Sequence, residues 1–165
     1  MSIISSLFKV LDRLSPAEEV FAHCDIPCGI YDPHLAQLAA HTVIRMTTMI
    51  NDLKTSGKDE THQISRLTKV KEEHAELVKH EVRIIWGDYF KEEHLQKYPN
   101  SHELVFKIMK LASKAKQGVN IEAANELLET VQKFAEIFWK TKGLETVRLV
   151  APYPTGGEIV LPKQS

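Results

Sequence analysis

The stretch DPHLAQLAAHTVIRMTTMINDL, residues 32–53, sets the pattern that most of the chain repeats. Asp32 is suited to accept hydrogen bonds from the first free amides of a helix, and Pro33 suits the first helical position, where an N–H is not needed. Apolar residues then recur on one helical face, namely Leu35, Leu38, Ala39, Val43, Met46, Ile50 and Leu53. The stretch therefore predicts an amphipathic helix that ends before Thr55-Ser56-Gly57.

Three more apolar stripes of the same kind follow along the chain. They predict helices over about residues 59–90, 100–118 and 120–143. Asn100 and Glu103 have the spacing of a capping box at the start of the third helix. Connections this short force consecutive helices to be antiparallel. The sequence thus predicts an all-α, up-down-up-down four-helix bundle.

The last residues have a different character. In VRLVAPYPTGGEIVLPKQS, residues 147–165, β-branched residues flank the turn-forming run Pro154-Thr155-Gly156-Gly157. This pattern predicts strand, turn and strand, so residues 144–165 are expected to form a C-terminal extension of β-hairpin character. A lone two-stranded hairpin is marginally stable in water, so it either packs on the bundle or stays mobile. The sequence leaves that choice open.

Composition limits the classes of function. A chain of 165 residues with 43% hydrophobic and 26% charged residues suits one globular domain. A net charge of -1 argues against nucleic-acid binding, and no apolar run reaches the roughly 18 residues of a membrane span. We therefore expect a soluble protein without nucleic-acid or membrane partners, and we separately expect it to be cytoplasmic. Its two cysteines are too few for a disulfide scaffold.

Residues 1–22 precede the predicted bundle as a separate segment. Ile3, Ile4, Leu7, Phe8, Leu11 and Leu14 fall at helical spacing. Lys9, Asp12 and Arg13 interrupt the apolar run that a secretory signal would need. The spacing alone is compatible with a surface helix docked on the body or with a removable leader, and it argues against export.

Both cysteines lie in HCDIPCGIYDP, residues 23–33, which Pro27 and Gly29 prevent from forming an ordinary helix. The three-residue spacing between Cys24 and Cys28 is less specific than the two-residue spacing of redox and zinc motifs. Unremarkable thiols, a disulfide or a metal site would all fit it. Zinc usually takes four side-chain ligands, whereas only His23, Cys24 and Cys28 lie close together here, with the Asp25 carboxylate a poorer candidate.

A cut between Ala22 and His23 would add backbone donors to this set. His23 would then offer a free α-amine and an imidazole, and Cys24 an amidate nitrogen and a thiolate. With the thiolate of Cys28 these atoms can form a planar N₂S₂ set with the imidazole as an axial fifth ligand. Nickel(II) and copper(II) prefer planar or tetragonal sites with nitrogen donors, and thiolates are soft enough to hold either metal.

The segment resembles the N-terminal hook of nickel superoxide dismutases, which begin His-Cys-Asp-x-Pro-Cys-Gly-x-Tyr-Asp-Pro. The resemblance continues in WGDYFKEEHLQKYP, residues 86–99, and in IFWKTK, residues 137–142. It implies a nickel enzyme that converts superoxide to dioxygen and hydrogen peroxide by cycling between nickel(III) and nickel(II). It also implies one nickel ion per chain.

The resemblance implies roles for individual residues. His23 would supply the α-amine and the axial imidazole, Cys24 the amidate and a thiolate, and Cys28 the second thiolate. Residues 1–22 would be a propeptide that a dedicated protease removes before His23. Residues 23–143, with the hook at 23–33, would form the four-helix domain of a homohexamer.

Further residues correspond to the surroundings of the metal. Tyr31 and Tyr89 match tyrosines that line its approach and could relay protons, as could ordered water, while Asp25 and Asp88 match acids that support the hook. Lys91 is a candidate for attracting the superoxide anion, although a solvated surface lysine is the plainer interpretation.

The chain also departs from the family. Ala39 and His74 stand where some members carry a glutamate and an arginine that brace the axial imidazole, and the residues after Gly143 extend past the usual end of the family. Two rival hypotheses are a non-catalytic nickel or copper carrier and a structural helical bundle with inert thiols. Neither rival requires His23 to be adjacent to Cys24, whereas the five-donor site does.

Overall fold

The computed structural model describes residues 29–54 and 56–163. Four long helices dominate it: α2 (His34–Asn51), α3 (Lys58–Ile84), α5 (Ser101–Gln117) and α6 (Ile121–Thr141). A π-helical turn, η1 (Ile85–Tyr89), continues α3, and a short helix, α4 (Glu92–Lys97), leads toward α5. Two strands, β1 (Thr146–Val150) and β2 (Glu158–Pro162), follow α6.

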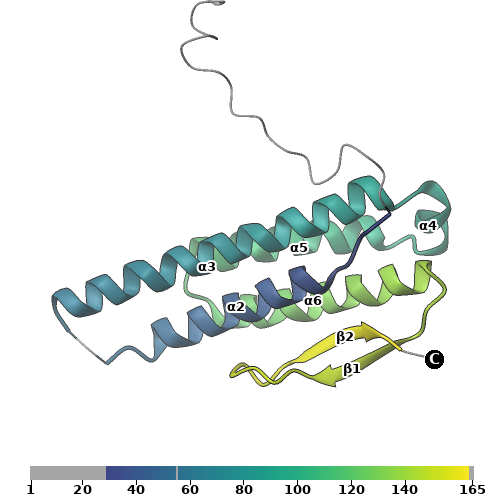
Figure 1. Cartoon of the computed structure of the whole chain (residues 1–165). Coiled ribbons are helices and arrows are strands. Elements are labelled where there is room, and N and C mark those ends of the chain that lie inside the picture. Colours follow the sequence, from purple (N-terminus) through teal and green to yellow (C-terminus); the bar gives the residue numbers. More distant parts are fainter. Residues whose placement is uncertain (1–28, 55, 164–165) are drawn as a thin grey trace, which may run out of the picture.

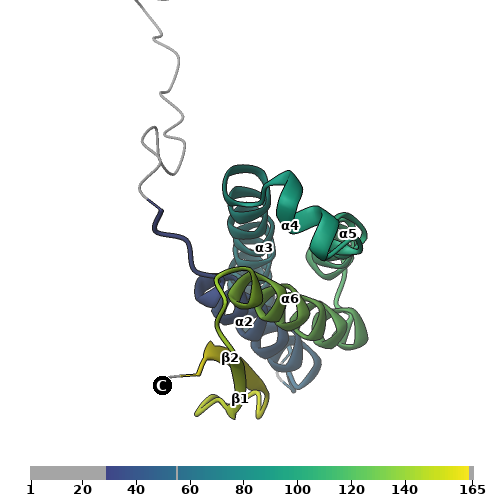
Figure 2. The ribbon, with the colours of Figure 1, turned by 90° about the vertical axis from the view of Figure 1, so that its right-hand side faces the viewer.

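The long helices form an antiparallel bundle, which confirms the predicted fold class (Figure 1). Helix α2 packs against α3 and α6, and α5 packs against the same two helices. The view along the bundle in Figure 2 shows the hairpin on the side formed by α2 and α6. The short helix α4 was not predicted, because its six residues are too few to display a helical period.

The core combines small and large side chains from facing helices. Ala36, Ala39 and Ala40 of α2 are essentially fully buried, as are Phe134 and Phe138 of α6. Small residues on one helix let the backbone of its neighbour approach, and the large rings fill the remaining space at native packing density. The apolar stripes read from the sequence therefore form the core.

Two predicted helix starts are confirmed in part and one is wrong. The Asp32 carboxylate accepts a hydrogen bond from the His34 amide at 2.7 Å, although α2 begins one residue later than predicted. Asn120 caps α6 by accepting from the Ala123 amide at 2.7 Å. The capping box at Asn100 is not formed, because this residue has φ −80° and ψ 4° rather than the extended backbone that turns a capping side chain back onto the helix.

The C-terminal residues form the predicted hairpin, and they pack on the bundle. Strands β1 and β2 are antiparallel, with Arg148 opposite Val160. The side chains of Ile159 and Val160 in β2 are buried. The choice that the sequence left open is settled in favour of packing, because β2 supplies apolar side chains that α2 and α6 cover.

Side chains of α2 and α6 hydrogen-bond the backbone of β2, and we call these contacts the hairpin seam. The Gln37 amide donates to the Val160 carbonyl at 3.0 Å and accepts from the Val160 N–H at 2.8 Å. His41 Nε2 lies 3.1 Å from the Glu158 carbonyl, and Gln132 donates to the same carbonyl at 2.6 Å. The seam thus satisfies the outward-facing backbone groups of a strand that would otherwise present an open edge.

Candidate metal centre

The described chain begins at one end of the bundle, where several segments meet. Figure 1 shows residues 29–33 at the same end as α4 and the last turn of α6. A cavity of about 380 Å³ opens there, which we call the site cavity. It is lined by Gly29, Tyr31, Asp88, Tyr89, Lys91, Glu93 and His94. Four predicted site residues, Tyr31, Asp88, Tyr89 and Lys91, therefore line one cavity.

The π-helical turn η1 positions two of these residues. The Phe90 amide donates to the Ile85 carbonyl at 3.2 Å, so the turn contains one residue more than an α-helical turn. Ile85 and Phe90, on either side, are buried in the core. With both ends anchored, the turn presents Asp88 at the surface and Tyr89 at the cavity wall.

Aromatic rings form one wall of the site cavity. The ring centroids of Tyr31 and Tyr89 are 5.6 Å apart. The Tyr89 ring also stacks on His94, with centroids 5.3 Å apart and an interplanar angle of 15°, and it contacts Phe138 at 4.9 Å. Lys142 Nζ lies 5.0 Å from the Tyr89 centroid. Packing on several sides leaves the Tyr89 ring little freedom to turn.

The charges around the cavity are mixed. The side chains of Lys91 and Lys142 are exposed, as are those of Asp88 and Glu93. Lys91 forms no salt bridge with any described residue, while His94 Nε2 lies 3.8 Å from a Glu93 carboxylate oxygen. The His94 Nδ1 atom accepts from the Lys91 amide at 3.1 Å, so the proton of the neutral ring is on Nε2, facing Glu93. Lys91 thus remains available to an anion that enters the cavity.

The predicted metal ligands lie outside the described residues. This holds for His23, Cys24 and Cys28, for Asp25, and for the bond between Ala22 and His23. The described chain nevertheless begins at Gly29, which follows Cys28 directly and lines the site cavity. Two thiolates with nitrogen donors form a set that is soft enough for nickel, so the residue types fit this metal. Residues 29–54 and 56–163 hold no competing cluster of three metal-binding side chains.

The two family departures lie away from the cavity lining. Ala39 is buried in the core, 1% exposed, and cannot hydrogen-bond an imidazole. His74 Nδ1 lies 2.8 Å from the Val70 carbonyl one turn earlier in α3. Neither Ala39 nor His74 lines the site cavity. Neither therefore takes the place, within the cavity lining, of the glutamate and arginine that brace the axial imidazole in some family members.

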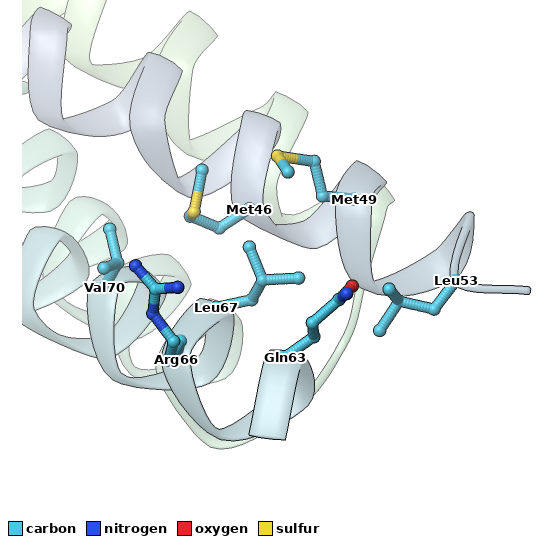
Figure 3. A pocket seen from close by; sticks show the side chains of 7 residues that line it. All are labelled: Met46, Met49, Leu53, Gln63, Arg66, Leu67 and Val70. Carbon is cyan, nitrogen blue, oxygen red and sulfur yellow. The ribbon is translucent and has the colours of Figure 1, made fainter. Parts of the chain in front are cut away.

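Another groove lies toward the C-terminal end of α2, and its lining is mainly apolar. Figure 3 shows Met46, Met49 and Leu53 facing residues of α3, among them Leu67 and Val70. Gln63 and Arg66 are the polar residues of its lining. This groove contains no acid, thiol or imidazole, and none of the predicted site residues lines it. No helix of the described part is long and apolar enough to cross a bilayer.

Sequence reasoning missed two residues beside Tyr89. His94 stacks on its ring and Thr141 hydrogen-bonds its hydroxyl. Both lie inside the stretches 86–99 and 137–142 that carry the family resemblance. The resemblance was a signal that these stretches matter, but only the packing of α6 against η1 shows which side chains meet.

Comparison with known proteins gives a consistent result. The sequence model of the family described as nickel-containing superoxide dismutase matches residues 18–142. The superoxide dismutase [Ni] of Streptomyces coelicolor is 40% identical over 134 residues, which are 81% of this chain and 98% of the relative. The superoxide dismutase [Ni] of Streptomyces seoulensis is 38% identical over the same shares.

Solved structures agree with the sequence comparisons. A native nickel superoxide dismutase structure at 1.30 Å is 39% identical, with a TM-score of 0.66 over 73% of this chain and 99% of that chain. A nickel-containing superoxide dismutase whose nickel ligation corresponds to the oxidised state gives a TM-score of 0.68 at 36% identity, over the same shares. The family match ends at residue 142, so the C-terminal hairpin lies outside it.

Proposed function

The chain belongs to the nickel-containing superoxide dismutase family, and from this premise we propose which residues bind the metal and which shape the site around it. Its activity is that of a superoxide dismutase, an oxidoreductase that converts superoxide to dioxygen and hydrogen peroxide, and its cofactor is nickel. One observation carries the site assignment. Gly29, which directly follows the hook cysteine Cys28, lines the same cavity as Tyr31, Asp88, Tyr89 and Lys91.

The hook holds the metal in this proposal. His23 provides its α-amine and imidazole, Cys24 its amide nitrogen and thiolate, and Cys28 its thiolate. When bound, one nickel ion per chain supplies the one-electron redox chemistry that dismutation needs. Anionic sulfur and nitrogen donors stabilise the higher oxidation state, so the cysteines tune the metal as well as hold it.

Cleavage before His23 creates one of these donors. In the uncut chain Ala22 acylates the His23 nitrogen, and an amide nitrogen is a poor ligand until it loses its proton. Residues 1–22 are therefore a propeptide that a processing protease removes, and residues 23–143 form the dismutase domain. The family match covers residues 18–142, so it includes the last residues of the proposed propeptide and ends beside residue 143, which supports the C-terminal boundary of the domain.

The described residues shape and charge the site cavity. Tyr31 and Tyr89 form an aromatic wall that limits how water and substrate approach the hook. Lys91, together with Lys142 over the Tyr89 ring, attracts the superoxide anion and offsets the charge of Asp88. Asp25 and Asp88 are proposed to support the hook.

The wider setting follows the same family. We place the enzyme in the cytoplasm, because a reducing compartment keeps Cys24 and Cys28 from forming a disulfide before nickel binds. We also propose a homohexamer. This assembly is the one that the family resemblance implies.

The test compares two forms of the protein, one that begins at His23 and one that is the verified uncut chain. We expect about one nickel per chain and rapid superoxide turnover in the first form only. Metal content by mass spectrometry and turnover are measured on the same samples, with Cys28→Ser as the control that loses both. Bound nickel without turnover would indicate a metal carrier, and turnover by the uncut chain would contradict the role of cleavage.

A further inference from the structure

The hydroxyl group of Tyr89 is held from the last turn of α6. Tyr89 Oη lies 2.8 Å from Thr141 Oγ1, and Thr141 Oγ1 lies 2.6 Å from the Phe138 carbonyl oxygen. These contacts join η1 to α6 across 52 residues of sequence. Thr141 is part-buried and is the last residue of its helix.

The direction of these two hydrogen bonds can be worked out. A carbonyl oxygen only accepts, so the single hydroxyl proton of Thr141 points at Phe138. In a continuing helix the Lys142 amide would serve the Phe138 carbonyl, but that amide donates to the Trp139 carbonyl at 3.0 Å instead. The Thr141 hydroxyl is therefore needed at Phe138. Its oxygen can then only accept from Tyr89, which makes Tyr89 the donor.

The consequence concerns the proton of Tyr89. A phenol has one hydroxyl proton, and here this proton lies toward Thr141. The Tyr89 oxygen can therefore present only its lone pairs, and not its proton, to the site cavity. Displacement of the ring would break this arrangement, but the stacked His94 and the buried Phe138 hold the ring in place.

We propose that Thr141 is a positioning residue for the dismutase reaction, which rests on the function proposed above. By accepting a hydrogen bond from the Tyr89 hydroxyl, Thr141 makes Tyr89 a hydrogen-bond acceptor toward the cavity and not the proton donor for peroxide. The protons for hydrogen peroxide reach the product from another group or from water. Two tyrosines that look equivalent in the sequence thus acquire different roles.

The experiment uses nickel-loaded protein that begins at His23, with the variants Thr141→Val and Thr141→Ser. Valine keeps the branched shape without the hydroxyl, and serine keeps the hydroxyl. We expect Thr141→Val to lower kcat/KM about threefold to tenfold, the size expected for losing one neutral hydrogen bond, and Thr141→Ser to stay within about twofold of the parent. In a Tyr89→Phe background Thr141→Val should cause no further loss, because the group through which it acts is already gone.

A second measurement does not depend on turnover. In the metal-free protein, the exchange of the Tyr89 hydroxyl proton with water, followed by NMR, should be slow in the parent and in Thr141→Ser and fast in Thr141→Val. If Thr141→Val does not fold, Thr141→Ala removes the same hydroxyl with less bulk and is measured in its place.

Three results would overturn the proposal: equal kcat/KM for the valine and serine variants, an undiminished effect of Thr141→Val in the Tyr89→Phe background, or equal hydroxyl exchange in all variants. A parent protein that binds nickel without turnover would contradict the proposed function instead. The proton-exchange measurement would still decide the role of Thr141 in that case.

Discussion

The hairpin seam and the site cavity both contain polar side chains, but these side chains are buried and hydrogen-bonded in the seam and exposed in the cavity. In the seam Gln37 and His41 are buried, and each hydrogen-bonds a backbone group of β2. In the cavity Lys91 and Asp88 are exposed, and Lys91 has no salt-bridge partner among the described residues. Polar groups that are satisfied internally stabilise a fold, whereas those that face an open cavity remain available to a ligand.

The comparison also separates the family from what this chain adds to it. The site cavity lies within residues 18–142, which match the family, and the hairpin lies after them. The seam should therefore contribute to stability and the cavity to turnover. A substitution in the seam should have little effect on turnover, and one in the cavity should have little effect on stability. The following variants test that separation.

The largest effect is expected at the hook. Cys28→Ser in protein that begins at His23 should lose bound nickel and all measurable turnover, because an alcohol is a poor replacement for a thiolate on this metal. Its melting temperature without metal should equal that of the parent, since the bundle core does not depend on the hook. A metal-free variant that unfolds at a clearly lower temperature would show that hook and bundle are coupled.

A large effect on stability is expected in the seam. Gln37→Leu removes two hydrogen bonds and leaves the N–H and C=O of Val160 buried without partners, at a cost of about 2–4 kcal/mol in the free energy of unfolding. Urea denaturation measures this cost, and hydrogen exchange at the Val160 amide locates it. Turnover per bound nickel should not change. Gln117→Leu, at an exposed site on α5, is the matched control and should have little effect.

Acid should weaken the seam through His41. Burial lowers the pKa of His41 from its ordinary value of 6.5, and the hydrogen bond to the Glu158 carbonyl opposes this shift only in part. Well above pH 6.5 the ring is neutral in the folded and unfolded states, and its Nδ1 accepts from Thr155 at 2.7 Å.

As the pH falls below 6.5 the unfolded chain takes up a proton that the folded chain resists, so stability is lost until the lower folded pKa is passed. Unfolding free energies measured between pH 7.5 and pH 5 should show this loss, and His41→Gln should reduce it. An unchanged pH dependence in His41→Gln would assign the effect to other groups.

The smallest effect is expected at Lys91. Lys91→Ala should lower kcat/KM about twofold to threefold at low ionic strength and less at high salt, because an exposed charge attracts an anion over a distance that salt shortens. Lys114→Ala, an exposed lysine of α5 that does not line the cavity, is the control. Equal salt dependence in the two variants would show that Lys91 has no special role in attracting superoxide.

The sequence predicted the parts of the molecule that depend on local pattern. Each long helix follows from its apolar period, and Asn120 caps α6 as its residue type suggests. The capping box at Asn100 was wrong because the local backbone takes a turn conformation that the residue types do not reveal. Helix α4 was missed because six residues carry too little pattern.

What the sequence by itself determined is the bundle and the hairpin, since helical period and turn residues are read within a short window; the donor set of the hook stays a prediction from neighbouring residue types. Tertiary structure alone decided that Gln37 meets Val160, 123 residues away, and that Thr141 meets Tyr89. Side chains of the same type occur at many other positions. Which of these side chains meet depends on how whole helices pack against each other. That packing is set by the burial of all the apolar side chains in the core together, and not by the residues that form an individual polar contact.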